Sequence, residues 1–93
     1  MLNCPRCGAE LLHHVSTTVY DRKEDAPTVV ETTVSKGHVE VDPKSDGIGN
    51  PSSRRDGVVI AFTCEGCGDE PIELGIAQHK GSTEIGWRYF QKG

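Results

Sequence analysis

The four cysteines of the chain lie in two stretches of the same form, Cys4-Pro5-Arg6-Cys7-Gly8 and Cys64-Glu65-Gly66-Cys67-Gly68, here called the first and second knuckle. Two residues separate the cysteines of each, so one tight turn can direct two sulfur atoms to one point. The trailing glycine can adopt the positive φ that closes the turn and directs backbone N–H groups toward the sulfurs. Two such turns face to face offer four thiolates in a tetrahedron, as in structural Zn²⁺ sites. The spacing therefore predicts one metal ion per chain with the ligands Cys4, Cys7, Cys64 and Cys67.

Two disulfides and a redox-active cysteine pair are alternative uses of the same residues. The chain begins with Met1-Leu2-Asn3 and reaches the first knuckle without an apolar run, so we expect no secretory leader and a reducing, cytoplasmic location. Thiols stay reduced there, which favours metal binding over disulfides. A redox-active pair is expected beside a βαβ pattern, which the sequence lacks. Zn²⁺ is the expected ion, with iron as a substitute.

Size and composition favour a small domain that needs such a metal. The chain has 93 residues, of which 34% are hydrophobic and 5% aromatic, so we expect a single domain over 1–93 with a core of marginal stability. Ten Lys and Arg stand against fourteen Asp and Glu, for a net charge of −4, which opposes binding to nucleic acid. No apolar stretch has the length of a transmembrane helix, so no membrane contact is expected.

Alternation of β-branched or apolar residues with polar ones predicts strands and no helix. We expect an all-β fold, a small antiparallel sheet of about five to six strands held together by a four-cysteine metal site. The expected strands are residues 11–20, 28–34, 38–41, 58–64, 72–77 and 84–89. The segment 58–64 is apolar at nearly every position, so we expect it to be central and covered on both faces. In the first strand, one face is expected to carry Leu11, His13, Val15, Thr17 and Val19.

Turn residues divide these strands. Lys36-Gly37 and Lys80-Gly81 predict the turns of two hairpins. Asp42-Pro43 is expected to end the third strand. Asp69-Glu70-Pro71 is expected to connect the second knuckle to the fifth strand. The segment 44–56 combines several Gly, Pro, Asn and Ser residues with no apolar period, which predicts a mobile loop. Gly75 and Gly86 remove side chains from the polar face of the second hairpin, which predicts a bulge or a close approach of backbone.

The two knuckles and the strand order resemble the zinc ribbon family, and Cys4-Pro5-Arg6-Cys7-Gly8 also resembles the knuckle of rubredoxins. In zinc ribbons the four cysteines are the metal ligands, which implies that role for the four cysteines here. Fifty-six residues separate Cys7 from Cys64, more than in compact ribbons, so about 21–57 is expected to be an inserted hairpin and loop. Zinc ribbons serve in transcription factors, ribosomal proteins, enzyme appendages and small adaptors, whereas rubredoxins carry electrons on iron.

Two functions remain open on this basis. The first is a zinc-binding, non-catalytic interaction module, a small adaptor or regulator that binds another protein, which the negative charge and the inserted segment favour. The second is a nucleic-acid-binding zinc ribbon that acts as a transcriptional regulator, which requires a basic cluster of Lys36, Arg54, Arg55 and Lys80. We expect the inserted hairpin and loop to contact a protein partner, with Arg54 and Arg55 meeting acidic groups. No Ser-His-Asp pattern or phosphate-binding glycine motif appears, so we do not expect an enzyme.

Three further groups have both a functional and an ordinary interpretation. Arg6 either offsets the charge of the metal site or is a solvated turn residue. The four histidines are expected to be ordinary side chains, and the adjacent His13 and His14 should point to opposite faces of a strand. The C-terminal aromatic residues either pack in the core or form a binding hot spot: Trp87, Tyr89 and Phe90.

Overall fold

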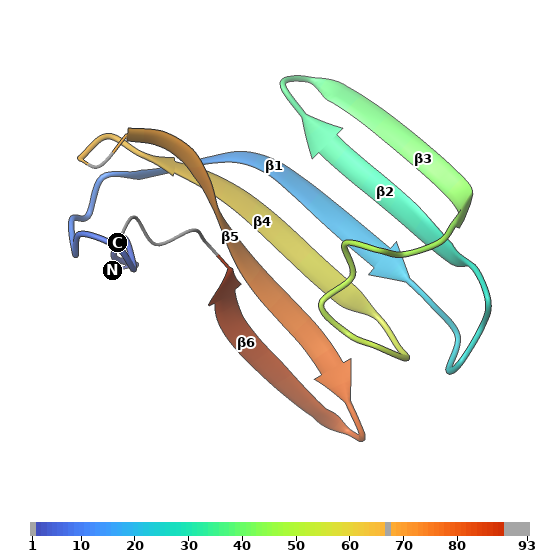
Figure 1. Ribbon diagram of the computed structural model, residues 1–93. Helices are drawn as coiled ribbons and strands as arrows, with labels where there is room; N and C mark the ends of the chain where they lie inside the picture. Colours follow the sequence, from blue (N-terminus) through green and yellow to red (C-terminus); the bar gives the residue numbers. More distant parts are fainter. Residues whose placement is uncertain (1, 67, 89–93) are drawn as a thin grey trace.

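The computed structural model describes residues 2–66 and 68–88, with the backbone alone for 68 and 69. Six antiparallel strands form one open sheet in the order β3-β2-β1-β4-β5-β6 (Figure 1). The strands are β1 (Leu12–Asp21), β2 (Val29–Ser35), β3 (His38–Ser45), β4 (Gly57–Cys64), β5 (Gly68–His79) and β6 (Ser82–Arg88). The described residues form no helix. The all-β antiparallel prediction is therefore confirmed.

Both predicted hairpin turns are confirmed. Lys36 and Gly37 join β2 to β3 with φ values of 50° and 79°, and Lys80 and Gly81 join β5 to β6 with 47° and 84°. Positive φ at both central residues is the geometry of two-residue hairpin turns, whose twist matches that of the strands.

Two proline-containing segments are strand rather than strand ends, which corrects the prediction. Pro43 lies inside β3, which continues to Ser45. Because β3 is an edge strand, a residue without an N–H is tolerated there. Pro71 lies inside β5, where the pairing with β4 shifts between Phe62 and Cys64. Irregular pairing is the other setting in which a strand accepts proline.

A bulge in β1 corrects the predicted faces of that strand. His14 is opposite Phe62 and Ser16 is opposite Ala61, so Val15 is an extra residue. Alternation reverses across such a bulge. In a regular strand an odd-numbered and an even-numbered residue point to opposite faces. Because of the bulge, His13 and Tyr20 share a face.

Opposed residues of an antiparallel sheet share a face, so the register divides the side chains into two sets. One face, here the loop face, carries Thr18, Tyr20, Val29, Glu31, Glu40, Gly57, Val59, Gly75 and Glu84. The other, here the open face, carries Val19, Val30, Val34, Val39, Val41, Val58, Ile60, Phe62, Ile76, Ile85 and Trp87.

The segment 46–56 covers the loop face instead of projecting as a mobile loop. Tyr20, Val29 and Val59 form a buried cluster on this face. An ideal Cβ built on Gly75 would lie 3.2 Å from Cβ of Pro51, whereas one on Gly86 would meet no atom within 4 Å. Gly75 thus makes room for a side chain and not for backbone, and the pairing of the two glycines shows no bulge, which corrects the prediction. Ser52 is buried and donates its hydroxyl to the carbonyl oxygen of Gln78 at 2.9 Å. Burial raises the pKa of the Tyr20 phenol, and the Glu31 carboxylate raises it further.

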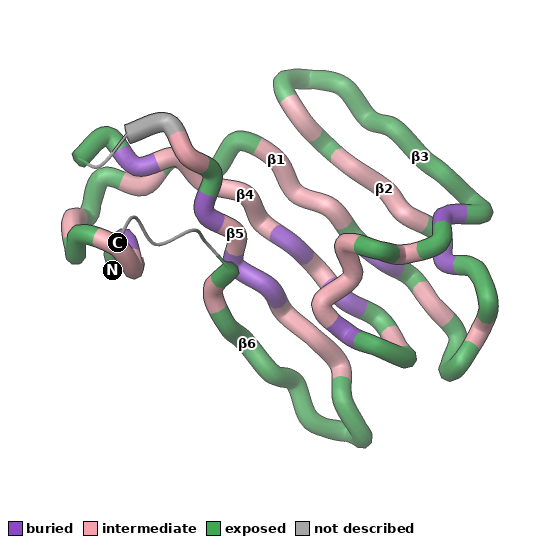
Figure 2. Tube along the Cα trace, in the orientation of Figure 1, coloured by how far each residue is buried: buried purple, intermediate pink, exposed green. Residues whose placement is uncertain are grey.

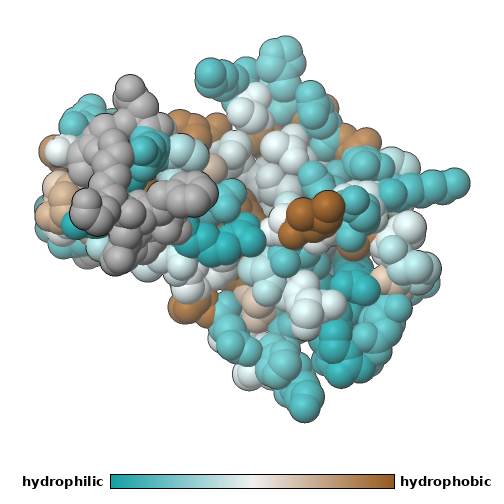
Figure 3. All heavy atoms as spheres, viewed as in Figure 1, coloured by the Kyte–Doolittle hydropathy of each residue, from teal (hydrophilic) through white to brown (hydrophobic). Residues whose placement is uncertain are grey.

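Among the described residues, the buried side chains of the open face lie on β4 and β5 toward the end next to the knuckles and include Leu74. There Ile72 is fully buried with Cys4 and Cys64, and Leu12 and Trp87 pack against them. Elsewhere Val34, Val39, Val41 and Ile85 are exposed, so the expectation that β4 is covered on both faces is wrong for Val58, Ile60 and Phe62, which are half-buried. Figure 2 shows the buried residues concentrated on β4, β5 and the segments next to them. In the view of Figure 1 the segment 46–56 crosses in front of the sheet, and Figure 3 shows that side as mainly hydrophilic.

Substitution of Gly57 tests the cover of the loop face. A Cβ at Gly57 would meet Oδ1 of Asn50 and lie 2.9 Å from Cδ of Pro51. We expect Gly57→Ala to lower the free energy of unfolding by about 1–3 kcal/mol because the cover must shift. Gly86→Ala is the matched control, since a Cβ there meets no atom within 4 Å, and it should be neutral or stabilising by roughly 0.5–1 kcal/mol. Equal urea midpoints for the two variants would contradict this packing.

Candidate metal centre

Backbone hydrogen bonds shape the first knuckle. The Cys4 amide donates to the carbonyl oxygen of Ala9 at 2.8 Å, and the Gly8 amide donates to the carbonyl oxygen of Cys4 at 2.8 Å. Gly8 has a φ of 78°, as the sequence predicts for the residue that closes the turn.

The sheet delivers the second knuckle to the first. Cys64 is the last residue of β4 and is opposite Leu12 of β1, and the Glu65 amide donates to the carbonyl oxygen of Leu11 at 3.1 Å. An ideal Cβ on Gly66 would lie 3.5 Å from Sγ of Cys7 and 3.8 Å from Sγ of Cys64. The turn after Cys64 therefore passes directly beside the sulfur atoms.

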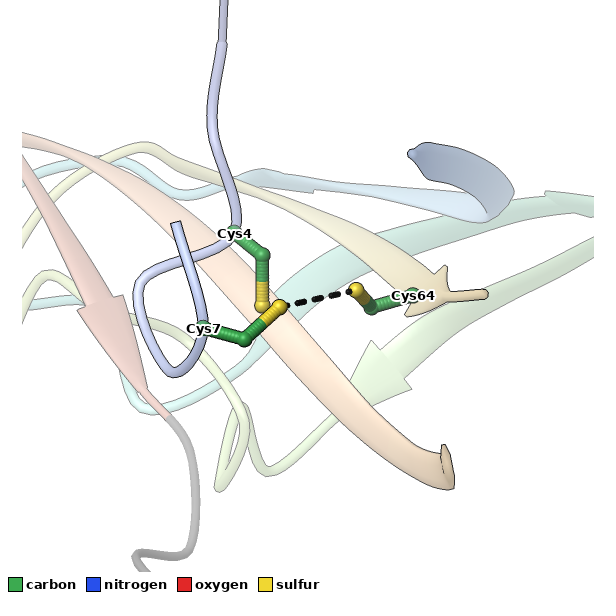
Figure 4. Close-up of side chains that lie close together, drawn as sticks. All are labelled: Cys4, Cys7 and Cys64. Atoms are coloured by element: carbon green, nitrogen blue, oxygen red, sulfur yellow. Dashed lines mark hydrogen bonds between the residues drawn. The ribbon is translucent and has the colours of Figure 1, made fainter. Parts of the chain in front are cut away.

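Three cysteine sulfurs converge on one point, and Figure 4 shows them directed toward one another. The sulfurs of Cys4, Cys7 and Cys64 all lie within 4.8 Å of each other, and those of Cys7 and Cys64 are 3.6 Å apart. That separation is far longer than an S–S bond of about 2.05 Å. It is close to the edge of about 3.8 Å in a tetrahedron whose metal–sulfur bonds are about 2.3 Å. Cys4 and Cys64 are 2% and 3% exposed, whereas Cys7 is exposed.

The donor set fits a metal ion that prefers sulfur. Thiolates are soft ligands, and three of them within 4.8 Å of one another leave one position of a tetrahedral site to be filled. The predicted fourth ligand, Cys67, lies outside the described residues.

Arg6 connects the first knuckle to β5. Its Nη1 donates to Oε2 of Glu70 at 3.2 Å, and its Nη2 donates to the carbonyl oxygen of Glu70 at 2.7 Å. The Arg6 side chain is only 10% exposed, and its Nε has no hydrogen-bond partner among the residues that the structure describes. Arg6 is thus not a solvated turn residue. No local pattern in the sequence pairs Arg6 with Glu70, because 64 positions separate the two.

Arg54 and Arg55 form ion pairs within the chain. Arg54 donates from Nε and Nη2 to the two carboxylate oxygens of Asp25 at 2.7 and 2.6 Å, and Arg55 donates to Glu24 at 2.9 Å. The hydrogen bond from Arg54 lowers the pKa of the Asp25 carboxyl. The acidic groups that these arginines meet in the structure therefore belong to the loop after β1.

The remaining basic residues named from the sequence do not join this pair. Lys36 lies in the β2–β3 turn and Lys80 in the β5–β6 turn, and these two hairpins form opposite edges of the sheet. His13 and His14 lie on opposite faces, as predicted, and Nε2 of the exposed His13 is 3.0 Å from Oε1 of Glu65. Trp87 is half-buried and its ring centroid is 5.9 Å from that of Phe62, while Tyr89 and Phe90 lie outside the described residues.

Comparisons of the chain with protein-family models, with curated proteins and with solved structures found no match. Within the described part of the chain, no helix has the length and apolar character needed to cross a membrane.

Replacing Cys64 tests the metal centre. We expect Cys64→Ser to lose the bound metal and the β signal in circular dichroism, because binding to a small structural site supplies on the order of 10 kcal/mol of folding free energy. Thr63→Ser is the control, since its side chain lies on the opposite face of β4. Native mass spectrometry of the parent chain should show one metal ion, and its removal should make four thiols reactive. Unchanged thermal stability of Cys64→Ser would refute this role.

Arg6 should contribute more to stability than an exposed arginine. Loss of its two hydrogen bonds to Glu70 in Arg6→Ala is expected to lower the free energy of unfolding by about 1.5–3 kcal/mol. Arg55→Ala removes an exposed ion pair, whose expected contribution is below about 1 kcal/mol. Urea denaturation of the metal-loaded proteins measures both. A loss for Arg6→Ala no larger than that for Arg55→Ala would show that the link to β5 contributes little.

Proposed function

We propose that this protein is a zinc-binding, non-catalytic interaction module that binds another protein chain through the open face of its sheet. The observation that carries the proposal is the exposure of that face. The exposed fractions are 65% for Val39, 58% for Val41 and 68% for Ile85. All three belong to the mainly apolar open face. Monomeric soluble proteins rarely leave a large contiguous apolar patch uncovered, and such patches are typical of interaction sites.

Zinc is the proposed ion, with Cys67 as the fourth ligand beside the three described cysteines. Zn²⁺ favours four tetrahedral thiolates in closed structural sites, where it takes part in no redox step. The knuckle-and-strand pattern that resembles zinc ribbons supports the same role. Iron remains the substitute ion, because four thiolates also bind iron.

Nucleic acid is the less favoured partner. Arg54 and Arg55 are neutralised by Glu24 and Asp25, and the two hairpin lysines lie at opposite edges of the sheet. Phosphate recognition relies on clustered Lys and Arg. Contact of Arg54 or Arg55 with a protein partner stays a prediction, and such a partner would have to compete with the two acidic residues of the chain.

Site-specific photocrosslinking tests the proposed binding face. We expect a benzoylphenylalanine at Val41 to give a crosslinked protein product in the native host, because this position lies on the open face. The same residue at Glu40, the adjacent position on the opposite face of β3, is the matched control. Mass spectrometry identifies the product. Equal products from both positions, or none from Val41, would contradict binding through this face.

A further inference from the structure

We propose that the chain covering the open face is a second copy of this protein, so that two sheets pack face to face in a symmetric dimer. The inference rests on the proposed function, which assigns protein binding to this face, and it adds the identity of the partner. Three properties of the face carry it: charge, area and shape.

Charge separates the two faces of the sheet. Away from the knuckles the paired positions of the open face carry uncharged side chains, with Asp21 at the end of β1, opposite Val30, as the charged exception. The uncharged residues are Thr17, Val19, Val30, Thr32, Val34, Val39, Val41, Val58, Ile60, Phe62, Ile76, Ile85 and Trp87. The loop face carries Glu31, Glu40, Asp42, Glu73, Glu84 and Arg88. Asp21 and Lys44 lie at strand ends that border the open face.

This distribution suits a second copy. The net charge of −4 opposes the approach of two identical chains, but an isologous interface brings each surface onto itself. A face whose one charged paired residue, Asp21, lies at the end of a strand can meet its own copy with that charge at the rim. The loop face cannot, because its acidic side chains would then face one another.

The area of the open face is sufficient for a stable dimer. Six strands about 4.8 Å apart span about 24 Å, and seven residues at about 3.4 Å each give a similar length along the strands. Each copy thus offers about 600 Å², and two copies together about 1,200 Å². Specific protein interfaces begin at about this size.

The shape of the face is that of one half of a β-sandwich. Valine and isoleucine side chains standing on a pleated sheet interdigitate with those of a second sheet about 10 Å away, and strand directions then differ by about 30°. Among the residues that the structure describes, the segment 46–56 forms a layer on the loop face, and the knuckles cover one end of the open face, so no second sheet lies against the rest of it. A second copy supplies a layer of matching length and curvature.

Analytical ultracentrifugation of the metal-loaded chain tests the dimer. We expect a species of twice the chain mass of 10.1 kDa at about 100 μM chain. Val39→Lys combined with Val41→Lys should raise the dimer Kd at least about tenfold, because lysines would enter an apolar interface. Glu40→Lys makes the same change in charge on the same strand but on the loop face, and it should leave the Kd within about twofold.

Ile85→Lys separates face packing from edge pairing. Ile85 lies on β6 and Val41 on β3, at opposite edges of the sheet, so only packing of whole faces places both in one interface. We expect Ile85→Lys to weaken the dimer at least about tenfold as well. Circular dichroism and metal content verify that each variant is folded.

The outcomes distinguish this inference from the proposed function. A monomeric parent chain, or a dimer that survives the lysine substitutions on the open face, would overturn the inference. If the parent is monomeric and Val41 crosslinks to a different protein, the inference fails and the proposed function stands. If the parent is monomeric and Val41 gives no product, both fail. A dimer sensitive to Ile85→Lys and insensitive to Glu40→Lys supports both.

Discussion

A single sheet has two faces, and a chain of 93 residues has little material with which to cover them. The segment 46–56 covers one face over the buried Tyr20, Val29 and Val59. The knuckles cover only one end of the other, over Ile72. Domains gain stability by packing two layers against each other. This unequal cover therefore leaves both a small core and an exposed apolar surface.

The cluster of Cys4, Cys7 and Cys64 joins parts of the chain that are far apart in sequence, and a metal ion bound there would compensate for the small core. Cys7 and Cys64 meet although 57 positions separate them, and Arg6 reaches Glu70 of β5 in the same region. Each contact closes a long loop of chain, which lowers the conformational entropy of the chain. A single weak interaction does not offset that loss. Metal–thiolate bonds are strong enough to supply that free energy.

The sequence predicted the elements with local signals and missed most of those that depend on distant contacts. Strand alternation and the Lys-Gly turns follow from local residue types and spacing. The convergence of Cys64 on Cys4 and Cys7 is a distant contact, and it could be predicted because the same cysteine spacing marks both of its ends. The burial of Ser52 does not follow from local signals, because the polar residues around it suggest a mobile loop. In the structure its hydroxyl donates a hydrogen bond to the carbonyl oxygen of Gln78 in β5. The pairing of Arg54 with Asp25 joins two loops and leaves no pattern in the sequence.

The bulge at Val15 shows how one irregular residue allows β1 to serve both faces. Leu12 packs against Cys4, Cys64 and Ile72 on the open face. Tyr20 packs under the segment 46–56 on the loop face. Both positions are even, so in a regular strand their side chains would share one face. One cluster would then lose its residue from β1. The extra residue between His14 and Ser16 reverses the alternation, and a simple hydrophobic pattern could not reveal this because it assumes an unbroken period of two.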